Sequence, residues 1–313
     1  MQFKKPKFWD KKNSFISFLL LPLSILMLFI ILLKKKFSKK LDSNIPVICI
    51  GNIYIGGTGK TPTTIFLAKE LSQIGKKPAI LRKHYESHSD EYNLIRNEFN
   101  SLFLNSNRAK GISEVESKGF DSVILDDGFQ DYKIKKNLSI ICFNNNQLIG
   151  NGFVLPAGPL REDLSSLKNA NIILINGKKN FEFEEKLLNV NKYLKIFYSK
   201  YKPKNLSLFK NKKLLAISGI GNPENFFKLL NENNLDIKEK LIFPDHYRFD
   251  ESEIRRISNN AKRKNYHIIM TEKDYYKVKD FKLSNIEYLK VDLEIFDKEN
   301  FLKIVKEVYD KKI

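Results

Sequence analysis

A glycine-rich segment at residues 56–61 is the feature that most constrains the fold of this chain. It follows an apolar run at 47–53, expected to be a buried strand, and precedes an expected helix at 60–74. Glycines let the backbone turn sharply and aim several N–H groups at one anion, and the helix N-terminus adds its dipole. This pattern predicts a nucleoside triphosphate site rather than a turn without function. The predicted binding residues are Gly56, Gly57, Thr58, Gly59, Lys60 and Thr61.

Two adjacent carboxylates follow another apolar run, residues 122–125. Asp126 and Asp127 would stand at the carboxyl end of a buried strand, which is where ligands bind in open α/β sheets. In a phosphate-binding loop of this kind the lysine, Lys60, reaches the β- and γ-phosphates and the hydroxyl of Thr61 ligates Mg²⁺. One of the two acids can face that Mg²⁺. The alternative is a solvated turn, because Asp-Asp-Gly is common in turns.

Short apolar runs alternate with amphipathic segments from residue 45 onward, which is the rhythm of a doubly wound parallel sheet. We therefore expect a P-loop NTPase-type α/β fold. The first set of strands is expected at 47–53, 78–81, 122–125, 138–143 and 172–175, with helices at 60–74, 90–103 and 109–118. The second set of strands is expected at 214–218, 241–243, 267–270 and 286–291, with helices at 223–231, 251–264 and 298–310.

Three regions emerge from this alternation. Residues 1–40 are expected to anchor the chain to a membrane, residues 41–205 to form the P-loop domain, and residues 206–313 to form a smaller α/β domain that closes over the active site. A stretch rich in Lys and Asn at 176–210 separates the two alternations and is interpreted as an interdomain connection.

The membrane interpretation depends on residues 15–33, a run of 19 residues without charge. As a helix it would be about 28 Å long, close to the roughly 30 Å of a bilayer's hydrocarbon core. Lysines flank it on both sides, and residues 1–40 hold ten lysines against one acid, Asp10. Whether the helix spans the membrane or lies in its interface stays open, because Pro22 can kink it and basic flanks on both sides obscure its orientation. A buried core helix is the remaining alternative.

Both cysteines lie within apolar runs expected to be buried strands. Cys49 and Cys142 have no partner at metal-ligand spacing. We interpret them as reduced core thiols of a cytosolic protein, in agreement with the cytosolic nucleotide that the loop requires.

Taken together, these segments resemble the tetraacyldisaccharide 4′-kinase family. The resemblance covers nearly the whole chain and is most specific at residues 155–162, LPAGPLRE. The chain departs from the family at residues 82–85, which read RKHY where the family has SRGY, and in the shortened segment before Asp90. The other matching segments are PKFW at 6–9, GN at 51–52, GGTGKTP at 56–62, LDDGFQ at 125–130, FPDHY at 243–247 and MTEKD at 270–274.

The resemblance implies an ATP- and Mg²⁺-dependent kinase of lipid A biosynthesis. It would phosphorylate the 4′-hydroxyl of a tetraacyl disaccharide 1-phosphate, giving lipid IVA, at the cytoplasmic face of the bacterial inner membrane. The implied partners are this lipid-linked disaccharide and, through the N-terminal helix, membrane lipids. No nucleic acid and no protein partner is expected.

The resemblance also implies roles for individual residues. Asp90 would be the base that activates the sugar hydroxyl, and His246 would support it. The two residues fall in different expected domains, so domain closure would be needed to bring them together. Asp90 as a helix cap, His246 as a structural residue and a surface ion pair at 161–162 are the alternatives. The other implied site residues are Lys60 and Arg161 at the phosphates, and Thr61, Asp126, Asp127 and Glu162 at the metal.

A second hypothesis is a membrane-attached P-loop GTPase or ATPase that acts as a targeting or assembly switch. A GTPase is expected to carry an Asn-Lys-x-Asp segment that recognises the guanine base, and the sequence contains none. The most similar segment is TEKD at residues 271–274, in which the residue order differs. Nucleic-acid binding is disfavoured because the lysines of the body are not clustered with aromatic residues in a recognisable module.

Overall fold

The structure is a computed structural model that describes residues 5–85 and 88–310. The chain divides into two compact units. The larger unit contains Lys5–His84, Phe99–Lys200 and the chain from Leu293 onward, and the smaller unit contains Tyr85–Glu98 and Tyr201–Asp292. Each unit is described separately below.

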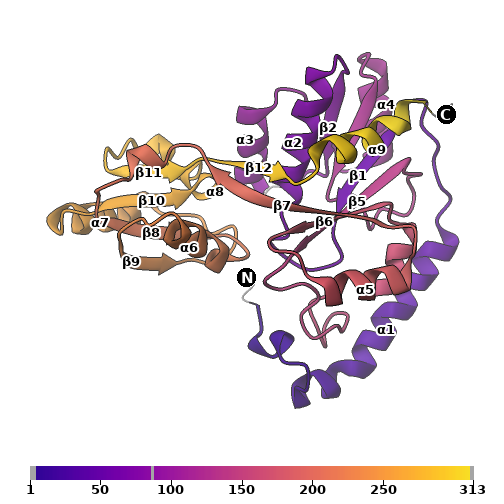
Figure 1. The fold of residues 1–313 in the computed structure, drawn as a ribbon, viewed down its shortest axis with the longest axis horizontal. Helices are drawn as coiled ribbons and strands as arrows, with labels where there is room; N and C mark the ends of the chain where they lie inside the picture. Colours follow the sequence, from indigo (N-terminus) through magenta and orange to yellow (C-terminus); the bar gives the residue numbers. More distant parts are fainter. Residues whose placement is uncertain (1–4, 86–87, 311–313) are drawn as a thin grey trace. The chain divides into compact units, whose positions relative to one another are not determined.

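An eight-stranded sheet forms the centre of the larger unit (Figure 1). Its order is β12-β7-β6-β5-β1-β4-β2-β3, and the strands from β3 to β7 pair in parallel. Because β1 has β4 on one side and β5 on the other, the chain winds away from the centre in both directions. The strands are β1 (Val47–Gly51), β2 (Pro78–Arg82), β3 (Leu102–Leu104), β4 (Ser122–Asp126), β5 (Leu138–Asn144), β6 (Ile172–Asn176), β7 (Lys195–Pro203) and β12 (Val291–Ile295).

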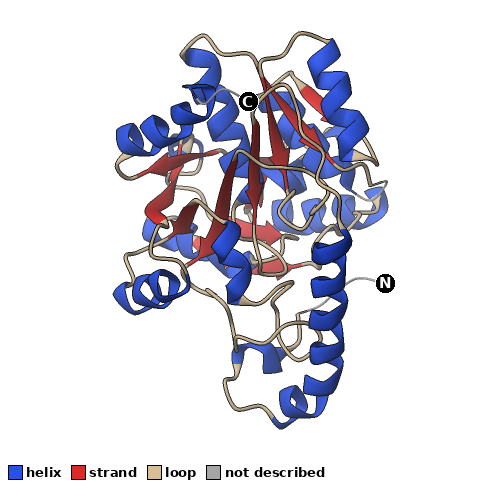
Figure 2. Cartoon of the chain, turned by 90° about the vertical axis from the view of Figure 1, so that its right-hand side faces the viewer, coloured by secondary structure: helices blue, strands red, loops and turns tan. Residues whose placement is uncertain are grey.

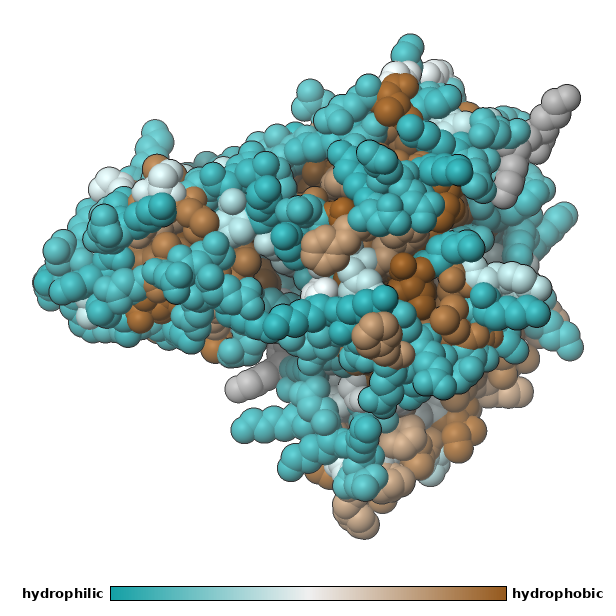
Figure 3. Space-filling view, viewed as in Figure 1, coloured by the Kyte–Doolittle hydropathy of each residue, from teal (hydrophilic) through white to brown (hydrophobic). Residues whose placement is uncertain are grey.

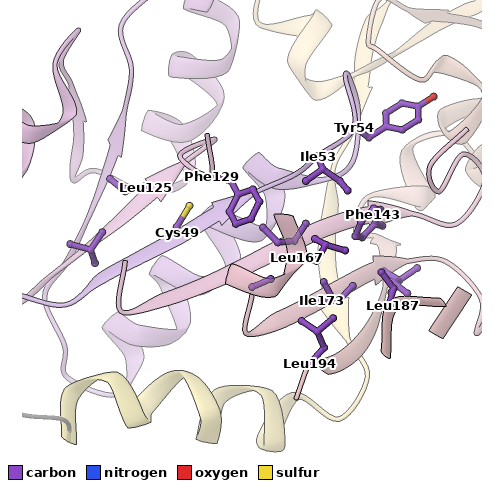
Figure 4. Close-up of a cluster of buried hydrophobic side chains, with 14 of the residues drawn as sticks. Cys49, Ile53, Tyr54, Leu125, Phe129, Phe143, Leu167, Ile173, Leu187 and Leu194 are labelled. Carbon is purple, nitrogen blue, oxygen red and sulfur yellow. The ribbon is translucent and has the colours of Figure 1, made fainter. Parts of the chain in front are cut away.

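Helices cover this sheet, and apolar side chains fill the space beneath them. The cluster in Figure 4 joins the buried strands to the residues after β1 and to Leu187 of α5. Cys49 and Cys142 are buried free thiols, as the sequence predicts. The helices of this unit are α1 (Phe15–Phe37), α2 (Lys60–Gln73), α4 (Arg108–Ser117), α5 (Phe181–Val190) and α9 (Lys298–Asp310), with 3-10 turns at Lys7–Asp10 and Leu164–Asn169.

The apolar helix α1 runs as one long helix beside the rest of its unit (Figure 2). Of the residues that the structure describes, it alone is long and apolar enough to cross a membrane by length and composition, with a mean hydropathy of 2.9. Only Ser17, Ser24 and Ile31 are buried, at intervals of seven residues that place them on one face of the helix. The remaining faces expose apolar side chains, which gather along α1 at the lower right of Figure 3.

A four-stranded parallel sheet with the order β11-β10-β8-β9 forms the smaller unit. Its apolar core lies on both faces of the sheet, under α6 and α7. The strands are β8 (Leu214–Ser218), β9 (Ile237–Ile242), β10 (His267–Thr271) and β11 (Ile286–Leu289). The helices are α3 (Ser89–Glu98), α6 (Pro223–Glu232), α7 (Glu251–Arg263) and α8 (Glu272–Tyr275), with 3-10 turns at Leu206–Leu208 and Lys279–Phe281.

The predicted fold class is confirmed, and three details of the prediction are wrong. The helix expected at 90–103 ends at Glu98, and the apolar residues after it form the edge strand β3. The stretch at 176–210 is not a plain connection, because it contains α5 and β7. The strand expected at 286–291 is two strands, β11 and β12, that belong to different sheets.

The two units also differ in extent from the expected regions. Residues 85–98 precede half of the larger unit in sequence but group with the smaller one, and the chain from Leu293 returns to the larger unit. There, Phe301 of α9 packs against Phe66 and Phe197, and the Tyr309 hydroxyl donates to Ser122 Oγ over 2.7 Å. These contacts join residues far apart in sequence, so local patterns do not reveal them.

Candidate nucleotide and base sites

The phosphate loop leaves β1 and enters α2 with two glycines in the left-handed region. Gly56 has φ 94° and Gly59, the N-cap of α2, has φ 90°, values that L side chains rarely adopt. The first turn of α2 therefore begins directly at Lys60, with its free N–H groups at the end of the loop. This geometry is that of an anion site at a helix N-terminus.

Asn52 holds the loop from inside. Its side chain is fully buried, and its Nδ2 donates to the carbonyl of Tyr54 and, over 2.9 Å, to Thr58 Oγ1. Gln130 Nε2 in turn donates to the Asn52 carbonyl over 2.8 Å. Thr58 is thus a brace of the loop, and the carboxyl end of β1 is tied to the turn that follows β4.

Asp126 ends β4 beside the phosphate loop. It is fully buried, and its Oδ2 accepts from Thr61 Oγ1 over 3.3 Å while its Oδ1 accepts from Thr64 Oγ1 over 3.2 Å. The guanidinium of Arg82 forms an ion pair with the same carboxylate and donates to Thr61 Oγ1 over 3.3 Å. Arg82 and Asp126 are register partners of β2 and β4, which explains their proximity.

Asp127 faces the other way, into a cluster of cations. Arg161 Nη1 donates to both of its carboxylate oxygens over 2.9 and 3.0 Å, and Lys60 Nζ lies 3.7 Å from Oδ1. Burial alone would raise the pKa of Asp127, but Lys60 and Arg161 outweigh it and hold the pKa below its usual range. Burial likewise lowers the pKa of Lys60, against the opposing effect of Asp127.

The segment at residues 155–162 connects the phosphate loop to α1. On one side, Arg161 N donates to the Ile53 carbonyl over 2.7 Å, and Leu160 forms an isolated antiparallel β-bridge with Tyr54. On the other side, Ser24 Oγ of α1 donates to the Val154 carbonyl over 2.8 Å and accepts from Ala157 N over 3.0 Å. The most specific motif of the sequence is therefore a structural bridge, and it also contains two of the predicted site residues.

Glu162 lies at the end of this bridge and is almost fully buried. Its Oε2 lies 2.6 Å from Lys35 Nζ of α1. Burial, followed by the charge of Glu162, raises the pKa of Tyr132. The charge of Glu162 also acts on Lys136. The predicted role of Glu162 at the metal stays a prediction.

Asp90 and His246 meet within the smaller unit. Asp90 lies in the first turn of α3, and its Oδ1 is 3.2 Å from Nδ1 of His246, in the turn after β9. His246 has a φ of 58°, which is uncommon for a residue with a side chain. The expectation that domains must close to bring the two together is wrong, because α3 belongs to the same unit as His246.

Two lysines, one on α8 and one just after it, complete the surroundings of Asp90. Lys273 Nζ and Lys277 Nζ lie 3.7 and 3.5 Å from its Oδ2. Burial alone would raise the pKa of Asp90, but the hydrogen bond with His246 and the charge of Lys273 lower it to about 2. Asp90 is therefore ionised across the physiological range.

The structure thus brings the predicted residues together in two clusters, one in each unit, except that Glu162 pairs with Lys35 instead. Sequence reasoning missed Arg82, Lys273 and Lys277. A usable signal for Arg82 was its place at the end of β2, the strand that pairs with β4, which ends in Asp126. The segment at 271–274 matched the family but carried no assigned role for Lys273.

The parallel sheet, the loop at a helix N-terminus and the acid at the end of the neighbouring strand define a P-loop nucleotide-binding protein. A narrower assignment comes from comparison. The family model described as tetraacyldisaccharide-1-P 4′-kinase matches residues 16–100 and 88–310. The chain belongs to this family, and the kinase function predicted from the sequence is confirmed over the GTPase or ATPase switch.

Curated relatives and a solved structure agree with this assignment. The chain is 42% identical to a tetraacyldisaccharide 4′-kinase of Pelagibacter ubique over 98% of each chain. It is 32% identical to that of Haemophilus influenzae over 97% of this chain and 96% of the relative. The crystal structure of LpxK from Aquifex aeolicus in complex with ATP shares the fold, with a TM-score of 0.72, 24% identity and coverage of 94% and 99%.

Proposed function

We propose that this chain transfers the γ-phosphate of ATP to the 4′-hydroxyl of a tetraacyl disaccharide 1-phosphate on the cytoplasmic face of the inner membrane. The observation that carries the proposal is the phosphate loop with Asp126 beside Thr61, in a chain of the 4′-kinase family. The curated relatives bear the name of this activity over nearly their full length.

The donor set beside the phosphate loop fits Mg²⁺. Thr61 Oγ1 and Asp126 Oδ2 are hard oxygen ligands 3.3 Å apart, at the end of a helix whose N-terminus favours phosphate. These two residues would hold the ion, which supplies charge neutralisation on the phosphates when it is bound. Lys60 and Arg161, both paired with Asp127, are placed to bind the phosphate oxygens.

Asp90 is the proposed base, and its low pKa limits how it can act. A carboxylate with a pKa of about 2 holds a proton weakly, so it would orient the sugar hydroxyl more than remove its proton early. This suits a loose phosphoryl-transfer transition state. In such a state the bond to the nucleophile has barely formed, so the hydroxyl does not need to lose its proton early. The neighbouring imidazole of His246, whose Nδ1 lies 3.2 Å from Asp90 Oδ1, supports the carboxylate in this orientation.

The exposed faces of α1 are proposed to bind lipid, with the helix lying in the membrane interface. Its buried face is held by hydrogen bonds between Ser24 and residues 154 and 157 and by the ion pair of Lys35. A helix fixed along one side to a polar body is not surrounded by lipid, so only its free faces insert. The soluble body, and with it the nucleotide site, then stays on the cytoplasmic side.

The test uses full-length protein, the tetraacyl disaccharide 1-phosphate in detergent, and ATP labelled at the γ-phosphate. Wild-type protein is expected to transfer label to the lipid, and Lys60→Ala is expected to lower the rate at least 100-fold. Lys110→Ala, which removes an exposed lysine of α4, is the matched control and should retain the rate. Absence of labelled lipid with wild type, or full activity of Lys60→Ala, would refute the proposal.

A further inference from the structure

We propose that Lys273 is a positioning residue that holds His246 in the neutral tautomer with its hydrogen on Nδ1. In this state the ring donates to Asp90 and keeps it oriented towards the sugar hydroxyl. The inference rests on the proposed role of Asp90 and His246 and adds a third residue to it. Lys273 is not proposed to touch the substrate.

The argument begins with the two ring nitrogens of His246. Lys273 Nζ lies 3.3 Å from Nε2, and Asp90 Oδ1 lies 3.2 Å from Nδ1. An ammonium group has only donors, so Nε2 must accept and cannot carry the hydrogen. The hydrogen of the neutral ring is therefore on Nδ1, where the ionised carboxylate of Asp90 accepts it. Both contacts select the same tautomer.

Lys273 is itself held in place. Its Nζ lies 3.1 Å from Glu91 Oε1 and 3.0 Å from Asp245 Oδ1, and its side chain is only 14% exposed. These contacts come from α3 and from the turn that carries His246, while Lys273 lies on α8. Two other segments thus each place one carboxylate against the ammonium group of Lys273, and these two carboxylates fix its position.

The charges around His246 explain what the ammonium prevents. Glu91 Oε1 and Asp245 Oδ1 each lie 3.9 Å from Nε2. Without the ammonium, these two carboxylates would be acceptors for a hydrogen on Nε2, and nothing would hold the ring hydrogen on Nδ1. The charged or titratable groups recorded around the ring are Asp90, Glu91, His88, Asp245 and Lys273, with Lys277 beyond Asp90.

A metal site is the alternative interpretation of the side chains around His246. His88, Glu91 and His246 each offer a ligand atom within 4.8 Å of the others. However, the two imidazole rings are stacked, with centroids 4.4 Å apart and planes only 6° from parallel. Ring nitrogens bind a metal in the plane of the ring, and two parallel stacked planes do not share such a point. The arrangement therefore favours an ammonium at Nε2 over a shared metal.

The test reads the tautomer directly, by ¹⁵N NMR of full-length protein labelled at histidine, with His246→Gln to assign its signals. Wild type at pH 7.5 is expected to show a neutral ring protonated on Nδ1. Lys273→Met is expected to move the ring hydrogen from Nδ1 to Nε2 in a substantial share of molecules, whereas Lys273→Arg should keep the wild-type pattern. The matched control is Lys262→Met, at an exposed lysine of α7.

Kinetics supply the second readout. Lys273→Met should lower kcat about tenfold or more without changing KM for ATP, and Lys273→Arg should retain most of the wild-type rate. A merely structural role would lower the rate without moving the hydrogen between the two ring nitrogens of His246. The inference is overturned if wild-type His246 is protonated on Nε2, or if Lys273→Met leaves its signals unchanged. Lack of lipid kinase activity in wild type would refute the proposed function but would leave the NMR result standing.

Discussion

Lys35 Nζ of the apolar helix lies 2.6 Å from Oε2 of Glu162, at the end of the segment that leads to the nucleotide site. The carboxylate is 1% exposed and the lysine side chain 26% exposed, so the pair is largely withdrawn from water. Through this pair and Ser24, the helix that carries the exposed apolar surface is fixed to the same residues that flank the phosphate loop. The apolar helix and the nucleotide site are thus joined by one structural bridge.

This ion pair leads to a prediction about stability. Lys35→Met leaves a buried carboxylate without its cation, which should lower the free energy of unfolding by about 1–3 kcal/mol. Denaturant unfolding in detergent measures the loss. The neighbouring Lys36 is exposed, so Lys36→Met is the control and should change little. Equal losses in the two variants would mean that the pair contributes nothing.

Arg82 is predicted to stabilise the empty nucleotide site. Because Asp126 is fully buried, Arg82→Met leaves it uncompensated and should cost about 3–5 kcal/mol of stability. Mg²⁺ with ATP should recover part of this loss, since a ligand that binds only the folded state stabilises it. Thermal unfolding with and without the nucleotide checks both points. A variant as stable as Arg96→Met, which changes an exposed arginine of α3, would contradict the prediction.

The exposed face of α1 is predicted to control membrane binding. Leu19, Leu26 and Phe29 are 69%, 55% and 56% exposed, and burying one such side chain in lipid is worth about 1.5–3 kcal/mol. Replacing all three with Gln should therefore weaken binding to lipid vesicles by roughly 100-fold or more in a sedimentation assay. Ile242→Gln removes a comparably exposed apolar residue of the smaller unit and should have no effect. Unchanged sedimentation of the triple variant would exclude α1 as the lipid-binding element.

Asp90 should make stability depend on pH in the acid range. Its folded pKa of about 2 lies below the ordinary value near 3.8, so its stabilisation is complete above about pH 4 and is lost as pH falls towards 2. The pH-dependent part amounts to about 2 kcal/mol. Urea unfolding between pH 5.5 and 2.5 should show a shallower decline for Asp90→Asn than for wild type. Asp280→Asn, at an exposed acid, should decline as wild type does; identical slopes for all three would contradict the assignment.

The sequence predicts best what depends on local pattern. The loop at 56–61, the strand that ends in Asp126 and the apolar helix each carry their signal within about 20 residues. Strand β7, which lies between β12 and β6, was missed because three lysines within Lys195–Pro203 give it the composition of a polar connection. Helix α5 had a local signal, since Asn180 caps it by accepting from Phe183 N and Leu187 lies one turn beyond Phe183.

What the sequence could not predict depends on contacts between distant residues. The placement of Asp90 with His246 needs α3 to leave the unit that surrounds it in sequence, and no local pattern encodes this. The family resemblance paired the two residues but could not supply their geometry. The role of Lys273 could not be predicted for the same reason, because it depends on Glu91 and Asp245, which lie on two other segments.

The position of the transferred phosphate tests the proposed function most directly. Purified protein, MgATP and the tetraacyl disaccharide 1-phosphate are allowed to react, and the lipid product is examined by ³¹P NMR with proton correlation. The expected product carries a second phosphomonoester coupled to the proton at the 4′ carbon. A product that keeps a single phosphate, or that gains one at another position such as a diphosphate at carbon 1, would contradict the assignment as a 4′-kinase.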